Sequence, residues 1–158
     1  MNIAGIGGER LHVAWVSSAE AQRFVEVVCE VTESIRGQGK FKPESFATQL
    51  AAAESALSSE TLRWLVGKEV KTTTIGDVYG RKWDVNSFES VLDSVIEREY
   101  HSQLILQAVS EGCQSPRDIR TKTDLDLKKI SYLLADMEKR SLVEFRGMED
   151  HKPVFAAL

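Results

Sequence analysis

Residues 105–145, ILQAVSEGCQSPRDIRTKTDLDLKKISYLLADMEKRSLVEF, combine apolar residues at helical spacing with capping residues and end in a β-type run. The pair Ser115-Pro116 predicts the start of a short helix through Ile119, because serine caps helices and proline fits their first turn. Asp126 predicts the cap of a further helix. The apolar face of that helix consists of Ile130, Leu133, Leu134 and Met137. Residues 142–148 and 154–158 predict two strands joined by a turn at 149–152.

With the helix before it, this order of elements resembles the winged helix-turn-helix domains. The resemblance implies that the helix after Asp126 would read DNA bases while neighbouring cations contact phosphates. The candidate nucleic-acid-binding residues are Lys128, Lys129 and Tyr132. The candidate phosphate contacts are Arg117, Arg120 and Lys122.

The charge of this region argues against DNA as its main partner. Residues 101–158 hold nine Lys or Arg and nine Asp or Glu, and the predicted wing turn begins with Glu149 and Asp150. A phosphate backbone would meet both signs of charge, so the release of counterions would favour binding little. We therefore prefer a protein-docking domain and keep a DNA-binding transcriptional regulator as the alternative.

The middle of the chain is predicted to be helical, with one irregular connector. Pro43 begins one helix, and Ser58 or Ser59 caps a short helix that ends at Gly67. Residues 70–83 contain three consecutive threonines and two glycine turns, which favour extended backbone or a short hairpin. Trp64 and Trp83 flank this connector and are expected to anchor a small core. A long helix follows, capped by Asp84 and ended by Gly112.

Near the start, ERLHVAWVSSAEAQRFVEVV (residues 9–28) predicts one strand followed by one helix. Leu11, Val13 and Trp15 alternate along the strand, and Ser17 with Glu20 fits a capping box. The helix carries an apolar face and ends at Gly37 and Gly39, with Cys29 as a small buried residue beside that face. The apolar face comprises Phe24, Val27, Val28, Val31 and Ile35.

Residues 5–39, GIGGERLHVAWVSSAEAQRFVEVVCEVTESIRGQG, resemble the closing strand-helix segment of the delta subunit family of methyl-viologen-reducing hydrogenase, which also accompanies heterodisulfide reductases. The matching residues are Arg10, Leu11, Trp15, Val16, Ser17, Ala19, Glu20, Phe24, Val27 and Val28. The resemblance implies a place beside a hydrogenase, formate dehydrogenase or heterodisulfide-reductase type of assembly. That family holds its iron–sulfur cluster on cysteines ahead of this segment, and no residue here corresponds to them. The iron–sulfur cluster and flavin are therefore expected on partner subunits, with no cofactor bound by this chain.

A single strand of this kind needs a neighbour, because each buried and unpaired backbone group costs about 1–3 kcal/mol. We expect a partner protein to supply that neighbour by strand addition, unless residues 70–75 or the wing do so. The predicted partner-binding residues are Leu11, Val13, Trp15, Phe24 and Val28.

The composition of the 158-residue chain excludes several classes of protein and kinds of site. A formal charge of −4 is unusual for a protein that coats nucleic acid, and two cysteines suit neither a disulfide framework nor a cluster site. No secretory signal or membrane span is evident, so a cytoplasmic protein is expected. The glycines at 5, 7 and 8 do not fit a nucleotide loop. His12, His101 and His151 lack metal-ligand spacing, and no catalytic motif indicates an enzyme acting alone.

The predicted fold class is α+β and predominantly helical. Residues 1–40 would form a strand-helix remnant of an α/β domain, residues 41–84 a helical segment and connector, and residues 85–158 a winged helix-turn-helix-like domain. The predicted function is a non-catalytic accessory subunit, or C-terminal domain, of an anaerobic electron-transfer complex.

Overall fold

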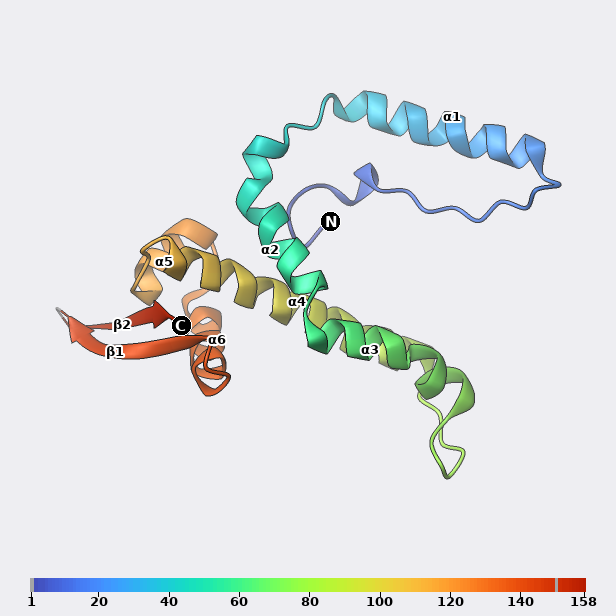
Figure 1. Ribbon diagram of the computed structural model, residues 1–158. Coiled ribbons are helices and arrows are strands. Elements are labelled where there is room, and N and C mark those ends of the chain that lie inside the picture. Colours follow the sequence, from blue (N-terminus) through green and yellow to red (C-terminus); the bar gives the residue numbers. More distant parts are fainter. Residues whose placement is uncertain (1, 150) are drawn as a thin grey trace. The chain divides into compact units, whose positions relative to one another are not determined.

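The computed structural model describes residues 2–149 and 151–158, and is mostly helical with one two-stranded antiparallel sheet (Figure 1). The predicted class, α+β and predominantly helical, is confirmed. The chain divides into two compact units, residues 1–50 and 51–158. The helical elements are η1 (Gly8–Arg10), α1 (Ala21–Gln38), η2 (Pro43–Phe46), α2 (Ala47–Leu57), α3 (Glu60–Val70), η3 (Lys71–Ile75), α4 (Val85–Ser110), α5 (Pro116–Thr123) and α6 (Leu127–Lys139). The strands are β1 (Val143–Glu149) and β2 (Lys152–Ala157).

In the first unit, the strand predicted at residues 11–16 is not formed. Residues 11–17 have no regular secondary structure, and residues 13–16 make no backbone hydrogen bond within the described part of the chain. The physical reason is non-local: alternating apolar residues permit a strand, but a strand exists only when a neighbour accepts and donates its hydrogen bonds. The N-terminal βα remnant is thus corrected to an irregular segment followed by a helix.

Helix α1 begins and ends close to its predicted signals. The Glu20 carboxylate accepts a hydrogen bond from the Ser17 N–H at 2.9 Å, which is one half of the predicted capping box. The helix starts at Ala21, after Glu20, and ends before Gly39, whose φ of 67° suits glycine. Cys29, predicted to be buried, is exposed because the helix face beside it is not covered.

In the second unit, residues 70–75 are helical and not extended as predicted. Helix α3, capped by Ser59, passes the predicted stop at Gly67 and continues into the π-helical turn η3. The hydroxyl of Thr73 donates to the Glu69 carbonyl at 2.8 Å, so this β-branched residue is accommodated inside the helix. The turn ends at Gly76, so residues 70–75 form no strand.

The main core of the second unit lies where α4, α5 and α6 meet the hairpin. Asp84 caps α4 and Asp126 caps α6, both as predicted. Ser115 caps α5, which extends beyond the predicted end at Ile119. The core side chains come from all four elements: Ile105, Ala108, Val109, Ile119, Ile130, Leu133, Leu134, Met137 and Val143.

Strands β1 and β2 pair antiparallel, from Val143 opposite Ala157 to Glu149 opposite Lys152. A register shift between Phe145 and Gly147 marks a β-bulge, and Gly147 has a φ of 129° that favours glycine. The predicted turn at 149–152 includes Asp150, which lies outside the described residues. The Phe155 N–H also donates to the Gln114 carbonyl at 2.9 Å, so β2 is joined to the loop between α4 and α5.

Over the described ranges, 2–149 and 151–158, we find no helix with the length and apolar character needed to cross a bilayer.

Candidate functional site

The predicted docking residues of the N-terminal segment are all exposed to solvent. Leu11, Val13 and Trp15 occupy alternate positions in residues 11–17, and the Trp15 side chain is 96% exposed. Figure 1 shows the segment running back along the length of α1 within the first unit. An indole so fully in water is unusual, because a tryptophan side chain contributes 150–250 Å² of largely apolar surface.

The predicted helix residues, Phe24 and Val28, lie one turn apart on α1 and are also exposed. None of the 18 residues of α1, all of them described, is buried. The structure therefore brings Phe24 and Val28 together on one helix face and places Leu11, Val13 and Trp15 on a separate segment. We call these five residues the N-terminal apolar surface.

Arg10 fixes the start of this segment, a role that sequence reasoning missed. Its guanidinium donates to the carbonyls of Gln38 at 2.9 Å and Gly39 at 3.3 Å, at the carboxyl end of α1. The same group lies 5.4 Å from the centre of the Phe41 ring. A cation suits this end of a helix, where carbonyls lack helical partners and the dipole is negative. Arg10 and Leu11 are among the residues that carry the family resemblance. The contact of Arg10 with residues 38 and 39 could not be predicted, because no local sequence pattern indicates it.

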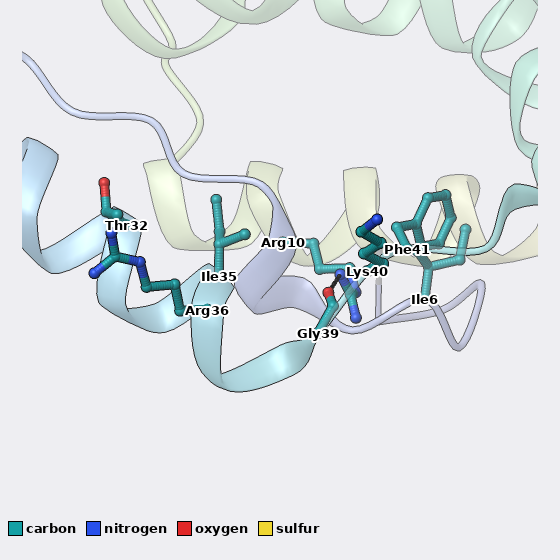
Figure 2. Close-up of a pocket in the computed structure, with 8 residues that line it drawn as sticks. All are labelled: Ile6, Arg10, Thr32, Ile35, Arg36, Gly39, Lys40 and Phe41. Atoms are coloured by element: carbon teal, nitrogen blue, oxygen red, sulfur yellow. Dashed lines mark hydrogen bonds between the residues drawn. The ribbon is translucent and has the colours of Figure 1, made fainter.

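A hollow of about 760 Å³ adjoins this anchor, entirely within the first unit (Figure 2). Figure 2 shows Thr32, Ile35 and Arg36 on α1, and Ile6, Arg10 and Phe41 on the chain before and after the helix. The remaining lining residues are Gly39 and Lys40. The hollow thus lies at the carboxyl end of α1, and none of the five residues of the N-terminal apolar surface is among its lining residues.

The alternative site, on α6, is only partly available. Lys128 is exposed, and Tyr132 is 69% exposed one turn later. The Lys129 ammonium is paired with the Glu97 carboxylate of α4, and this pair lowers the pKa of Glu97. Two of the three predicted DNA-contacting side chains therefore project freely, while the third ties α6 to α4.

Of the three predicted phosphate contacts, one is likewise engaged in an ion pair, and two are in none among the described residues. Lys122 is paired with Glu111, whose carboxylate raises the pKa of the ammonium. Arg117 and Arg120 line a hollow of about 480 Å³ together with Thr121, Asp124 and Leu127.

Metal-ligating side chains are dispersed in the part of the chain that the structure describes. No group of three His, Cys, Asp or Glu side chains is placed there to hold a metal ion. Cys29 belongs to the first unit, and Cys113 is half-buried against the core of the second.

Comparison of the chain with protein-family models, with curated proteins and with solved structures gave no match.

Proposed function

We propose that this chain is a non-catalytic accessory subunit, or C-terminal domain, of an anaerobic electron-transfer complex of the hydrogenase or heterodisulfide-reductase type. It docks an iron–sulfur or flavin subunit through the N-terminal apolar surface. The observation that carries the proposal is Trp15, which is 96% exposed in a segment whose residues 13–16 have no backbone partner among the described residues.

Two physical properties of this segment suit docking. Large apolar side chains that are exposed gain stability when a partner covers them, because covering them removes apolar area from water. Extended backbone with unbonded N–H and C=O groups can add to the edge of a partner sheet, which gives affinity through main-chain hydrogen bonds. Alternate side chains such as Val13 and Trp15 would then face the same side of that sheet.

The choice of partner rests on the sequence resemblance over residues 5–39. In this proposal the iron–sulfur cluster and flavin belong to the partner subunits, and the complex is cytoplasmic. The chain contributes a binding surface, and electron transfer takes place in the partner.

A titration of the full chain with the purified iron–sulfur subunit of a heterodisulfide-reductase type of complex tests this proposal. We expect a complex on gel filtration at micromolar concentration. Trp15→Ala should weaken it about tenfold or more, because central aromatic residues carry much of the energy of an interface. The matched control is Lys152→Glu, an exposed charge reversal in the hairpin, which should leave binding nearly unchanged. No complex, or equal binding by Trp15→Ala and the unaltered chain, would refute the proposal.

For residues 85–158 we propose a winged helix-turn-helix domain. The supporting features are the order α4, α5, α6, β1, β2 and the hydrogen bond from Phe155 to Gln114, which adds a third backbone segment beside the hairpin. DNA binding by this domain is the second candidate function, favoured by the exposure of Lys128 and Tyr132 on α6.

A salt series separates the two functions. Binding of duplex DNA should weaken steeply as the salt concentration rises, since phosphate contacts release counterions. An apolar interface with a protein partner should change little over the same range.

A further inference from the structure

A second hollow, of about 730 Å³, lies in the second unit and has no role in the docking proposal. It is formed by α3, the π-turn η3, the turn that follows it and the first part of α4. Its volume lies in the range of small-ligand sites, about 300–1,000 Å³. Its lining includes two tryptophans, Trp64 and Trp83, and three lysines, Lys68, Lys71 and Lys82.

The aromatic side chains of this hollow face water instead of forming the small core expected from the sequence. Trp64 is 62% exposed and Trp83 is 52% exposed, while Phe88, also in the lining, is buried. Indole faces accept flat ring systems by stacking, and every nucleobase has such a face. The two tryptophans therefore offer platforms for a planar ring.

The charge of the lining is opposite to that of the chain. Four cationic residues line the hollow with one carboxylate, although the whole chain has a formal charge of −4. That carboxylate, Asp77, is already engaged: it accepts hydrogen bonds from Arg81 Nε at 2.8 Å and from the N–H groups of Tyr79 and Arg81. The hydrogen bonds from Arg81 and Tyr79 lower the pKa of Asp77, so it stays ionised and bound to the turn.

The three lysines are available for an anion. Within residues 2–149 and 151–158, no carboxylate lies within ion-pair distance of Lys68, Lys71 or Lys82. The ammonium of Lys68 lies 5.6 Å from the centre of the Trp64 ring, so a cation and an aromatic face adjoin each other. A ligand that carries both a ring and a negative group matches this pairing.

The turn that brings these groups together is held by backbone contacts. The Gly76 N–H donates to the Lys71 carbonyl at 2.7 Å, which closes the π-turn, and the Trp83 N–H donates to the Thr72 carbonyl at 3.1 Å. Gly76 has a φ of 94°, and a Cβ there would lie 2.9 Å from the Arg81 carbonyl oxygen. Only glycine fits at this position without a shift of the turn. π-turns of this kind occur often at functional sites.

We propose that this hollow binds a mononucleotide, with the base stacked on Trp64 or Trp83 and the phosphate held by Lys68, Lys71 and Lys82. Lysine ammonium groups bind phosphate as point charges, which requires no fixed geometry from these flexible side chains.

Isothermal titration of the full chain with AMP tests the proposal, with adenosine and ribose 5-phosphate as probes of the ring and the phosphate alone. We expect AMP to bind with a Kd below about 1 mM, and each fragment to bind at least about tenfold more weakly. The absence of saturable AMP binding, or equal binding of AMP and ribose 5-phosphate, would overturn it.

Paired variants locate the site. The double variant Lys71→Gln with Lys82→Gln should weaken AMP binding about tenfold or more, whereas Lys139→Gln with Lys152→Gln, at exposed lysines elsewhere, should leave it unchanged. Trp64→Ala with Trp83→Ala should weaken it about tenfold, and the aromatic replacements Trp64→Phe with Trp83→Phe should retain most of it. Equal weakening by both lysine pairs would place binding outside the hollow.

A short single-stranded oligonucleotide completes the test. If affinity rises steadily with the number of nucleotides, the surface binds nucleic acid and the proposal of a mononucleotide site is wrong. An affinity equal to that of AMP supports a site for one nucleotide. The outcome is independent of partner docking, because AMP binding and complex formation are measured with different ligands and different variants.

Discussion

Besides the apolar core, a buried ion pair joins α4 to the residue that follows α6. The Glu99 carboxylate of α4 is 1% exposed, and Arg140, just after α6, donates to it at 3.3 Å. Arg98 lies 3.6 Å away as a second cation. A buried carboxylate needs such partners, because loss of its hydration is costly.

We therefore expect Arg140→Ala to lower the free energy of unfolding by about 2 kcal/mol, since Glu99 would keep only one cation near it. Urea denaturation followed by circular dichroism measures this change. Lys139→Ala, at the adjacent exposed position, is the matched control and should change stability by less than about 0.5 kcal/mol. A loss of equal size in both variants would contradict the role given to Arg140.

Among the helices, the capping residue of α6 is expected to contribute measurably to stability. The Asp126 carboxylate accepts from the N–H groups of Lys128 at 2.9 Å and Lys129 at 3.3 Å. Asp126→Ala should lower the free energy of unfolding by about 1 kcal/mol, and Ser131→Ala, exposed within the same helix, should have a smaller effect. Thermal melts of both variants check the difference, and equal melting temperatures would count against the cap.

The contact between α4 and α6 also predicts a dependence on pH. His101 is buried on α4, and burial is the main cause that lowers the pKa of its imidazole from 6.5. Lys129 of α6 lowers it further, and Glu97, 3.8 Å from Nδ1, opposes this. The unfolded chain thus binds a proton more readily, so stability is complete above pH 6.5 and falls as the pH drops below it.

We expect the free energy of unfolding to fall between pH 7 and pH 5, and the variant His101→Gln to lose this dependence. Denaturation at a series of pH values measures the effect. The Glu97 carboxylate, whose pKa is also lowered, acts separately, below its ordinary value of 4.5. An unaltered slope between pH 7 and pH 5 in His101→Gln would show that another group titrates there.

The elements also show which parts of the fold can be predicted from the sequence. The caps at Asp84 and Asp126 are confirmed, and the cap predicted at Ser58 or Ser59 is Ser59, because a cap depends on residues only two or three positions apart. The prediction of extended backbone for residues 70–75 was wrong, since α3 runs on into the π-turn η3, where the Thr73 hydroxyl donates to the Glu69 carbonyl. The strand at 11–16 was wrong for a different reason, because a strand requires a partner that local spacing does not supply.

Some of the candidate functional residues could likewise be predicted from the sequence, and others could not. Leu11, Val13 and Trp15 are exposed, as the proposed docking role requires, and that role stays a prediction from their alternation and from the family resemblance. Arg10 and the hollow beside Trp64 and Trp83 could not be predicted, since both depend on contacts between distant parts of a unit.

On the scale of the whole molecule, the two units differ in how they cover apolar surface. The second unit has a core shared by three helices and a strand, whereas α1 of the first has no buried residue along its described length. In the proposed function, a partner protein covers this unit on binding, much as a disordered segment becomes ordered when it binds. We propose that residues 13–16, which have no backbone hydrogen bond among the described residues, receive their backbone partners from another protein.

Hydrogen exchange at the amides of residues 13–16, with and without the iron–sulfur partner subunit, tests this claim most directly. We expect rapid exchange in the isolated chain and, at saturating partner, strong protection of alternate amides, either those of residues 13 and 15 or those of residues 14 and 16, because successive N–H groups of a strand point to opposite edges and strand addition bonds one edge. Protection already present in the isolated chain, or exchange that stays rapid in the complex, would contradict it.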